Sequence, residues 1–330
     1  MLSLRNYNIV ASVAHFVCFL TLLILFIIFK IARQKANYKL YRYQITGPIN
    51  DSVIPPISPN TLSYCSTQQN NTENIGQCVV TPSYQQPLKV SQFNIIYACM
   101  AFFILTSLAH ALYAWDPYIK GLSGMKGEGF YSTAVLGYGW NPYRWIEYAL
   151  SASLMSCILG AVQGSNDLLQ ILFMAGVTAA MQFNGFTVES IFRNQIVDRF
   201  GGVDKTAIVG SSVCAWLLFV FLWLANLYAF FSVVKDINKK YKNAIDPYND
   251  KPVKIPGFVY FVVIVQLLNY AVFGFIQLYQ VVKNWNATSS LELIDFEKIE
   301  RLYLMLSFAA KLGLAGGVSY GLIFRTKNCK

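Results

Sequence analysis

Seven long apolar stretches constrain this chain more than any other feature of its sequence. Each approaches or exceeds the roughly 20 residues that a helix needs to cross a bilayer, and a helix satisfies its own backbone hydrogen bonds there. Hydrophobic residues make up 55% of the chain and charged residues only 13%, which argues against a soluble domain. We therefore expect an all-α membrane protein, a single seven-helix domain over residues 1–330. The stretches lie at residues 10–31, 95–115, 145–162, 168–188, 207–234, 257–282 and 302–324.

The connection between the first two stretches, residues 32–92, is unusually long for a loop. It carries turn-forming prolines and β-branched residues, and long connections are commonly functional or folded. We expect it to form a cap with a short β-hairpin or sheet on the membrane surface. Cys65 and Cys78 are candidates for a disulfide, and Asn50 and Asn70 begin glycosylation sequons. Both features are typical of the oxidising, extracellular side.

The distribution of lysines indicates the opposite orientation. Six lysines lie between the fifth and sixth stretches, and further basic residues follow the seventh, so the positive-inside rule places both segments in the cytoplasm. An even number of crossings separates them from the first loop, which means that the two signals conflict. The net charge of +10 suits a bilayer that contains anionic lipid, and nothing in the sequence suggests nucleic acid.

Lys311 lies in the middle of the last apolar stretch, where a free ammonium is costly. The cost is about 3 kcal/mol even on a lenient insertion scale, and the residue is too central for its amine to reach the interface comfortably. The amine must be paired, neutralised, or joined to a ligand, for example as a Schiff base with an aldehyde. Ser307 lies one turn earlier and faces the same way, although a serine in such a helix often bonds only its own backbone.

Glu147 opens the third stretch and is a natural partner for a positive charge elsewhere in the bundle. Protonated Lys311 can supply that charge. Arg144 lies three residues before Glu147 on the same helix face, so a pair with Arg144 alone is an alternative. A plain structural ion pair is another alternative. Glu189 ends the fourth stretch, and we expect it at the interface, where it can have a role in handling protons.

The chain has only two histidines, His15 in the first stretch and His110 in the second. A single buried histidine is more often a satisfied polar residue than a ligand. Two on neighbouring helices favour a shared, water-filled pocket that accepts protons near neutral pH. No third ligand accompanies them, so we expect no metal site, and we expect no catalytic residues and no enzyme activity.

Several strings in this sequence resemble the heliorhodopsins, and the resemblance covers essentially the whole membrane part. It implies a bundle of the microbial-rhodopsin type, in which Lys311 carries all-trans retinal as a protonated Schiff base and Glu147 is the counterion. The matching residues are Asn141-Pro142, Arg144 to Tyr148, Ser151 to Ser153, Leu306 to Lys311, His15, His110, Met181, Gly185 and Glu189.

The resemblance also implies roles for the remaining candidates. His15 and His110 would line a polar cavity on the cytoplasmic side, with Arg144 and Glu189 as further proton-handling residues. The family implies an N-terminus in the cytoplasm, a C-terminus outside the cell membrane, and a homodimer, with a signalling partner that the sequence does not identify. The candidates for retinal contact are Ser307, Tyr148, Ser151, Met181, Gly185, Phe273 and Gln277.

A light-driven conformational switch is the function that this resemblance implies. Isomerisation would move the Schiff-base N–H away from Glu147, release the proton to the polar cavity, and bias a two-state element. Light-gated passive conductance of protons or ions is an alternative. Active pumping is disfavoured because Ile158 and Ser307 occupy the positions where pumps carry carboxylates. A retinal-free transporter with a Lys311–Glu147 ion pair is a third possibility.

Overall fold

The computed structural model describes residues 4–28, 37–42, 88–115, 140–165, 167–198, 204–240, 255, 257–285 and 296–327. Within these ranges, seven helices are long and apolar enough to cross a membrane, so the chain is an integral membrane protein. They are α1 (Leu4–Ile28), α3 (Ile95–Trp115), α4 (Pro142–Gln163), α5 (Leu168–Asp198), α6 (Lys205–Lys240), α7 (Gly257–Asn284) and α8 (Phe296–Lys327).

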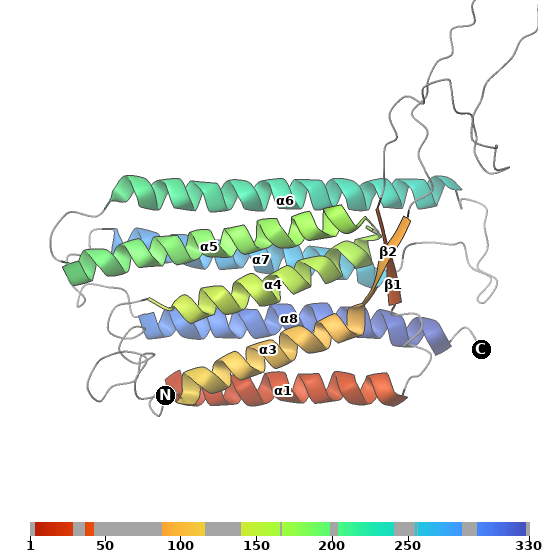
Figure 1. Cartoon of the computed structure of the whole chain (residues 1–330), viewed down its shortest axis with the longest axis horizontal. Coiled ribbons are helices and arrows are strands. Elements are labelled where there is room, and N and C mark those ends of the chain that lie inside the picture. Colours follow the sequence, from red (N-terminus) through yellow and green to blue (C-terminus); the bar gives the residue numbers. More distant parts are fainter. Residues whose placement is uncertain are drawn as a thin grey trace, which may run out of the picture.

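The helices lie side by side in one bundle, with α1 beginning at one end and α8 finishing at the other (Figure 1). The most extensive packing joins α1 to α3, α4 to α5, α5 to α6, and α7 to α8. Helix α4 also touches α3, α6, α7 and α8, so its side chains face the interior from several directions. The two central helices, α4 and α8, are therefore the ones that can bring side chains together inside the bundle.

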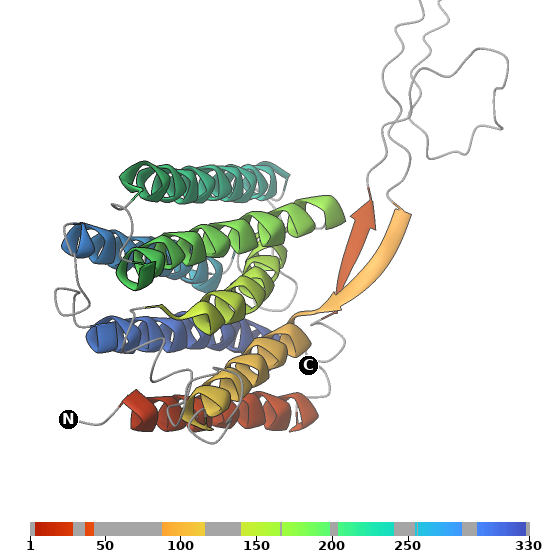
Figure 2. The ribbon, with the colours of Figure 1, turned by 60° about the vertical axis from the view of Figure 1, so that its left-hand side comes forward.

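Two short strands flank the loop that follows α1. Strands β1 (Asn37–Arg42) and β2 (Leu88–Asn94) pair antiparallel, with a shift of register between Leu40 and Tyr41. The pair lies at the end of the bundle where α8 finishes and projects away from the helices (Figure 2).

The small β-hairpin expected for this loop is not supported. The strands are the two ends of the loop, and residues 43–87 separate them where a hairpin would have a tight turn. Pairing of β1 and β2 therefore brings together the two chain segments that flank residues 43–87. The disulfide candidates Cys65 and Cys78 and the sequons at Asn50 and Asn70 lie outside the described residues.

Capping residues set several helix ends beyond the apolar stretches that the sequence predicts. Asn141 caps α4 by accepting a hydrogen bond from the Arg144 backbone N–H at 3.1 Å, with Pro142 in the first turn. Gly164 ends the same helix in a left-handed conformation with φ of 97°. Asp204 caps α6 through the Ala207 backbone N–H at 3.0 Å. The membrane-crossing segments are confirmed, and the helices extend past most of them.

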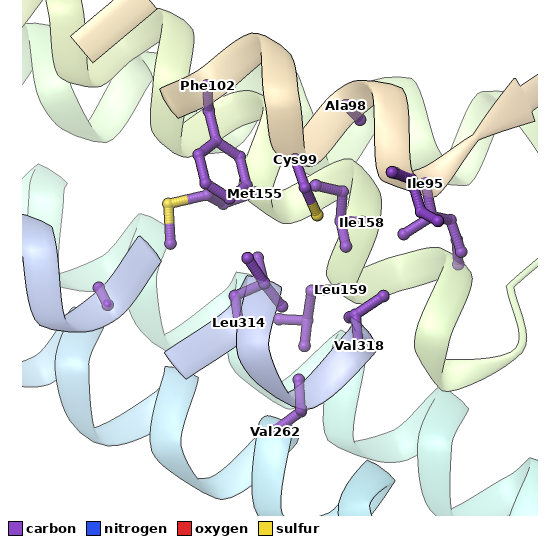
Figure 3. Packing of buried hydrophobic residues seen from close by; sticks show 14 of the residues in the cluster. Ile95, Ala98, Cys99, Phe102, Met155, Ile158, Leu159, Val262, Leu314 and Val318 are labelled. Carbon is purple, nitrogen blue, oxygen red and sulfur yellow. The ribbon is translucent and has the colours of Figure 1, made fainter. Parts of the chain in front are cut away.

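The apolar core occupies the half of the bundle nearest the strands. Helices α1 and α6 contribute to it, and most of its residues come from the first turns of α3 and α7 and the last turns of α4 and α8, which meet at that end (Figure 3). Phe102, Ile158, Val262 and Leu314 come from these four helices, and each is 0% exposed. Among the described residues, the buried charged side chains lie instead toward the other end, or at the middle of the bundle in the case of Lys311.

Candidate functional site

Lys311 and Glu147 form a buried ion pair between α8 and α4. The Lys311 Nζ atom lies 2.9 Å from Glu147 Oε1 and donates a second hydrogen bond to Ser307 Oγ at 2.8 Å. The lysine is 1% exposed and the glutamate 6% exposed. Because both groups are buried, each charge is stabilised by the other, and removal of one partner leaves the other buried and uncompensated.

Thr106 on α3 is a third partner of this pair. Its hydroxyl donates to Glu147 Oε1 at 2.5 Å, and its side chain is completely buried. Thr106 was not predicted from the sequence, because a threonine in an apolar helix ordinarily bonds its own backbone. One signal was available, since Thr106 lies one turn before His110 and therefore on the same helix face.

The two histidines lie together on neighbouring helices, α1 and α3, with ring centroids 5.6 Å apart. His15 Nδ1–H donates to the Ala11 carbonyl at 2.7 Å. His110 Nδ1–H donates to Asn8 Oδ1 at 2.8 Å, since the Asn8 amide nitrogen is itself donating to the Leu4 carbonyl. In its neutral form each ring therefore carries a lone pair on Nε2, and among the described residues neither Nε2 atom has a hydrogen-bond partner.

A cavity adjoins Lys311 between α4, α5, α6, α7 and α8. Lys311 is the one charged residue among the described side chains that line it, and the walls are mostly apolar or aromatic. An apolar cavity with an amine in its wall fits a long apolar aldehyde that needs a single covalent anchor. The lining residues are Trp145, Tyr148, Ser151, Ala152, Met155, Met181, Gln182, Ala215, Trp216, Phe219, Tyr270, Phe273, Gly274, Gln277, Ser307, Ala310 and Lys311.

Gly185 differs from the other candidates for retinal contact, which all line this cavity. The Trp145 ring fills the space that a Cβ at Gly185 would need, so Gly185 shapes the cavity by admitting that ring. Gly274 acts similarly on the opposite side, where an added Cβ would lie 2.9 Å from the Trp216 ring. Gly274 was not predicted from the sequence, because a glycine's role depends on which side chain faces it across the bundle.

Arg144 forms a second charged centre, separate from the Lys311–Glu147 pair. Its guanidinium contacts the carboxylates of Glu189 on α5 and Glu300 on α8. The expectation that Glu189 ends its helix at the interface is wrong, because α5 continues to Asp198 and Glu189 is 1% exposed. Glu300 was missed because it precedes the apolar stretch that begins at residue 302. Its spacing from Ser307 and Lys311 places all three on one helix face.

Aromatic side chains stand between the two charged centres. The Tyr148 hydroxyl donates to the Tyr303 carbonyl at 3.0 Å, and the Arg144 guanidinium lies 4.1 Å from the Tyr303 ring centroid. A small polar cavity beside these rings touches both centres, because Glu147 and Glu300 both line it. Its remaining lining residues are Asn8, His110, Tyr113, Asn141, Arg144, Tyr148 and Leu304.

Comparison with known protein families assigns the chain to a family. The heliorhodopsin family matches residues 60–323, which include α3 to α7 and nearly all of α8. No curated protein matches the chain. Helix α1 and His15 precede the matched residues, whereas Glu147 and Lys311 lie within them. The chain therefore belongs to the heliorhodopsin family, which implies a retinal chromophore and suggests a light-sensing role.

Proposed function

We propose that this protein is a light sensor whose apolar cavity holds all-trans retinal on Lys311 as a protonated Schiff base. The observation that carries the proposal is a wholly buried amine in the cavity wall, paired with the carboxylate of Glu147 at 2.9 Å. When bound, retinal absorbs visible light and isomerises. Ser307 is the hydrogen-bonding neighbour of the Lys311 nitrogen, and the single domain spans residues 1–330.

Glu147 is the counterion in this proposal and holds the proton on the Lys311 nitrogen. Opposite charges attract strongly in a low-dielectric interior, so separation of the two groups weakens the hold on that proton. The Nε2 atoms of His15 and His110 can accept this proton, because they have no hydrogen-bond partner among the described residues. Both histidines are buried. A change of charge at this pair then biases a two-state arrangement of the helices.

Reconstitution with all-trans retinal tests the proposal. The full-length protein is expected to develop a visible band that hydroxylamine bleaches, and Lys311→Ala is expected to stay colourless. Lys311→Ala combined with Glu147→Gln keeps the buried charge balanced, so its loss of colour is not an effect of misfolding. Lys283→Ala, at the end of α7 outside the cavity, is the matched control and should remain coloured. A colourless wild type, or colour in Lys311→Ala, would overturn the proposal.

Light-gated passive conductance is the second candidate function. It is favoured by the unpartnered Nε2 atoms of His15 and His110 and by the polar cavity that reaches Glu147. The wholly buried apolar side chains on the strand side of Lys311 disfavour it, because an ion needs polar groups or water along its entire path. A retinal-free transporter with an ion pair is the third possibility, and the colour of the reconstituted protein decides against it.

We further propose that the protein lies in the cell membrane as a homodimer, with its N-terminus in the cytoplasm and its C-terminus outside. Family resemblance supports the dimer and the orientation, and the sequons at Asn50 and Asn70 support an external first loop. The two strands that flank the loop and the last turn of α8 lie at the same end of the bundle, which supports a shared side for the loop and the C-terminus. An epitope tag after residue 330 should therefore bind antibody on intact cells, and labelling only after permeabilisation would reverse the orientation.

A further inference from the structure

The centre around Arg144 contains one positive side chain and two carboxylates. Arg144, Glu189 and Glu300 are 3%, 1% and 5% exposed, and they come from α4, α5 and α8. The Lys311–Glu147 pair is electrically balanced by itself and has no positive charge to share. With both carboxylates ionised, the Arg144 centre would carry a buried net negative charge.

Such a charge is unstable in a dry interior. A buried carboxylate without a compensating charge takes up a proton in preference to remaining ionised, because the neutral acid loses much less hydration on burial. The proton comes from water, and a new O–H bond on one carboxyl group makes the centre neutral. The remaining question is which of the two carboxyl groups receives it.

Hydrogen-bond donors distinguish the two carboxylates. Glu189 faces the Arg144 guanidinium, the Trp145 indole N–H at 2.8 Å, the Asn141 backbone N–H at 3.3 Å and the Gln280 amide at 3.4 Å. A group that accepts this many donors is stabilised in its ionised form. Glu300 has fewer donors, namely the guanidinium and the Asn141 side-chain amide at 3.0 Å.

The polar cavity next to Glu300 supplies an independent observation. His110 lines the same cavity and is 6% exposed, and its Nε2 atom carries a lone pair without a donor among the described residues. A protonated Glu300 therefore shares its cavity with an acceptor nitrogen. The titratable and charged groups around Glu300 among the described residues are His110 and Tyr113 on α3, Arg144, Glu147 and Tyr148 on α4, Glu189 on α5, and Tyr303 on α8.

We propose that Glu300 is a second proton-holding site of this protein, protonated at rest beside an ionised Arg144–Glu189 pair. This places a neutral acid in the cavity that also touches Glu147, next to the acceptor nitrogen of His110. The inference rests on the charge balance and the donors around Arg144. It does not depend on retinal binding, so it can fail or succeed separately from the light-sensing role.

Infrared absorption of the full-length protein in lipid at neutral pH tests this assignment. The wild type should show the carbonyl stretch of a protonated carboxylic acid, with the expected shift in heavy water, and Glu300→Gln should lose it. Glu189→Gln should lose the same band, because Arg144 then pairs with Glu300 alone and Glu300 ionises. Glu300→Asp should retain a carboxylic acid band, which guards against loss of the band through misfolding.

Glu297→Gln is the matched control. Glu297 lies one turn earlier on α8, is partly exposed, and pairs with Arg301 instead of Arg144, so the band should be unchanged. A wild type without a carboxylic acid band would overturn the assignment and would indicate that a charged His110 balances the centre. A band that persists at full strength in Glu300→Gln would overturn it as well. Because no step of the measurement uses visible light, a colourless protein gives the same test.

Discussion

The charge on Glu147 is the property of a single residue that should most affect the colour of the reconstituted protein. The carboxylate stabilises the ground state, in which positive charge sits on the Lys311 nitrogen, more than the excited state, in which that charge has moved away. We expect Glu147→Gln to shift the visible absorption maximum to the red. Glu297→Gln, the same change at a partly exposed position, should leave the maximum in place. An unshifted Glu147→Gln spectrum would assign the counterion to another group.

Loss of the Thr106 hydroxyl should shift the absorption maximum in the direction opposite to Glu147→Gln, because Thr106 acts on the same carboxylate. Its hydroxyl, 2.5 Å from Glu147 Oε1, draws negative charge away from the Lys311 nitrogen. Thr106→Val removes this donor with little change of shape, so the carboxylate should hold the positive charge more strongly and the absorption maximum should move to the blue. Thr187→Val is the control, because the Thr187 hydroxyl is exposed and bonds its own helix at the Phe183 carbonyl. A red shift, or none, in Thr106→Val would contradict this role.

The residues of the site differ in how visible they are in the sequence. Lys311 and Glu147 stand out because a charge within an apolar stretch demands an explanation. Thr106 carries no such signal, since its importance depends on a carboxylate that arrives from another helix. Arg144 was recognised, but its partners were not, because its position three residues before Glu147 suggests a local pair. The structure instead directs Arg144 to two carboxylates from α5 and α8.

Helices α7 and α8 approach each other closely at Gly317, and this contact can be tested directly. An added Cβ at Gly317 would overlap the Val262 side chain of α7, whereas one at Gly316 would meet nothing within 4 Å. We expect Gly317→Ala to lower the free energy of unfolding by about 1–3 kcal/mol through overpacking. Gly316→Ala should change it little. Thermal denaturation of the two variants in the same detergent measures this difference, and equal stabilities would contradict the close contact.

Helix positions followed from hydropathy, but helix ends did not. The second stretch agrees with α3 at both ends, residues 95 and 115, because β2 and its capping Asn94 adjoin the apolar run directly. Helix α8 begins six residues before the predicted start, at Phe296 and not at residue 302. Its first turns carry polar residues such as Glu300, which a hydropathy window assigns to water. Burial against Arg144 keeps these turns inside the bundle, and only tertiary structure reveals such burial.

At the scale of the whole molecule, the bundle is divided across the membrane into a polar half and an apolar half. The polar half contains both charged centres and the two histidines, and Lys311 lies near the boundary. The apolar half is filled by side chains from α1, α3, α4, α6, α7 and α8, which pack together without a charged group among the described residues (Figure 3). A proton that leaves the Lys311 nitrogen has the two histidines on one side and the apolar cluster on the other, which suits a switch better than a conduit.

This division leads to a prediction about electrical behaviour. In cells that express the protein with retinal, illumination is expected to produce no steady current at any holding voltage, because Phe102, Ile158 and Leu314 close the strand side of Lys311. Replacement of one of these three residues, as in Ile158→Ser, should not create a current while Phe102 and Leu314 stay packed. Lys311→Ala gives the baseline for retinal-independent leak. A light-dependent current that reverses with voltage would instead mean that the apolar half opens, and passive conductance would replace sensing as the function.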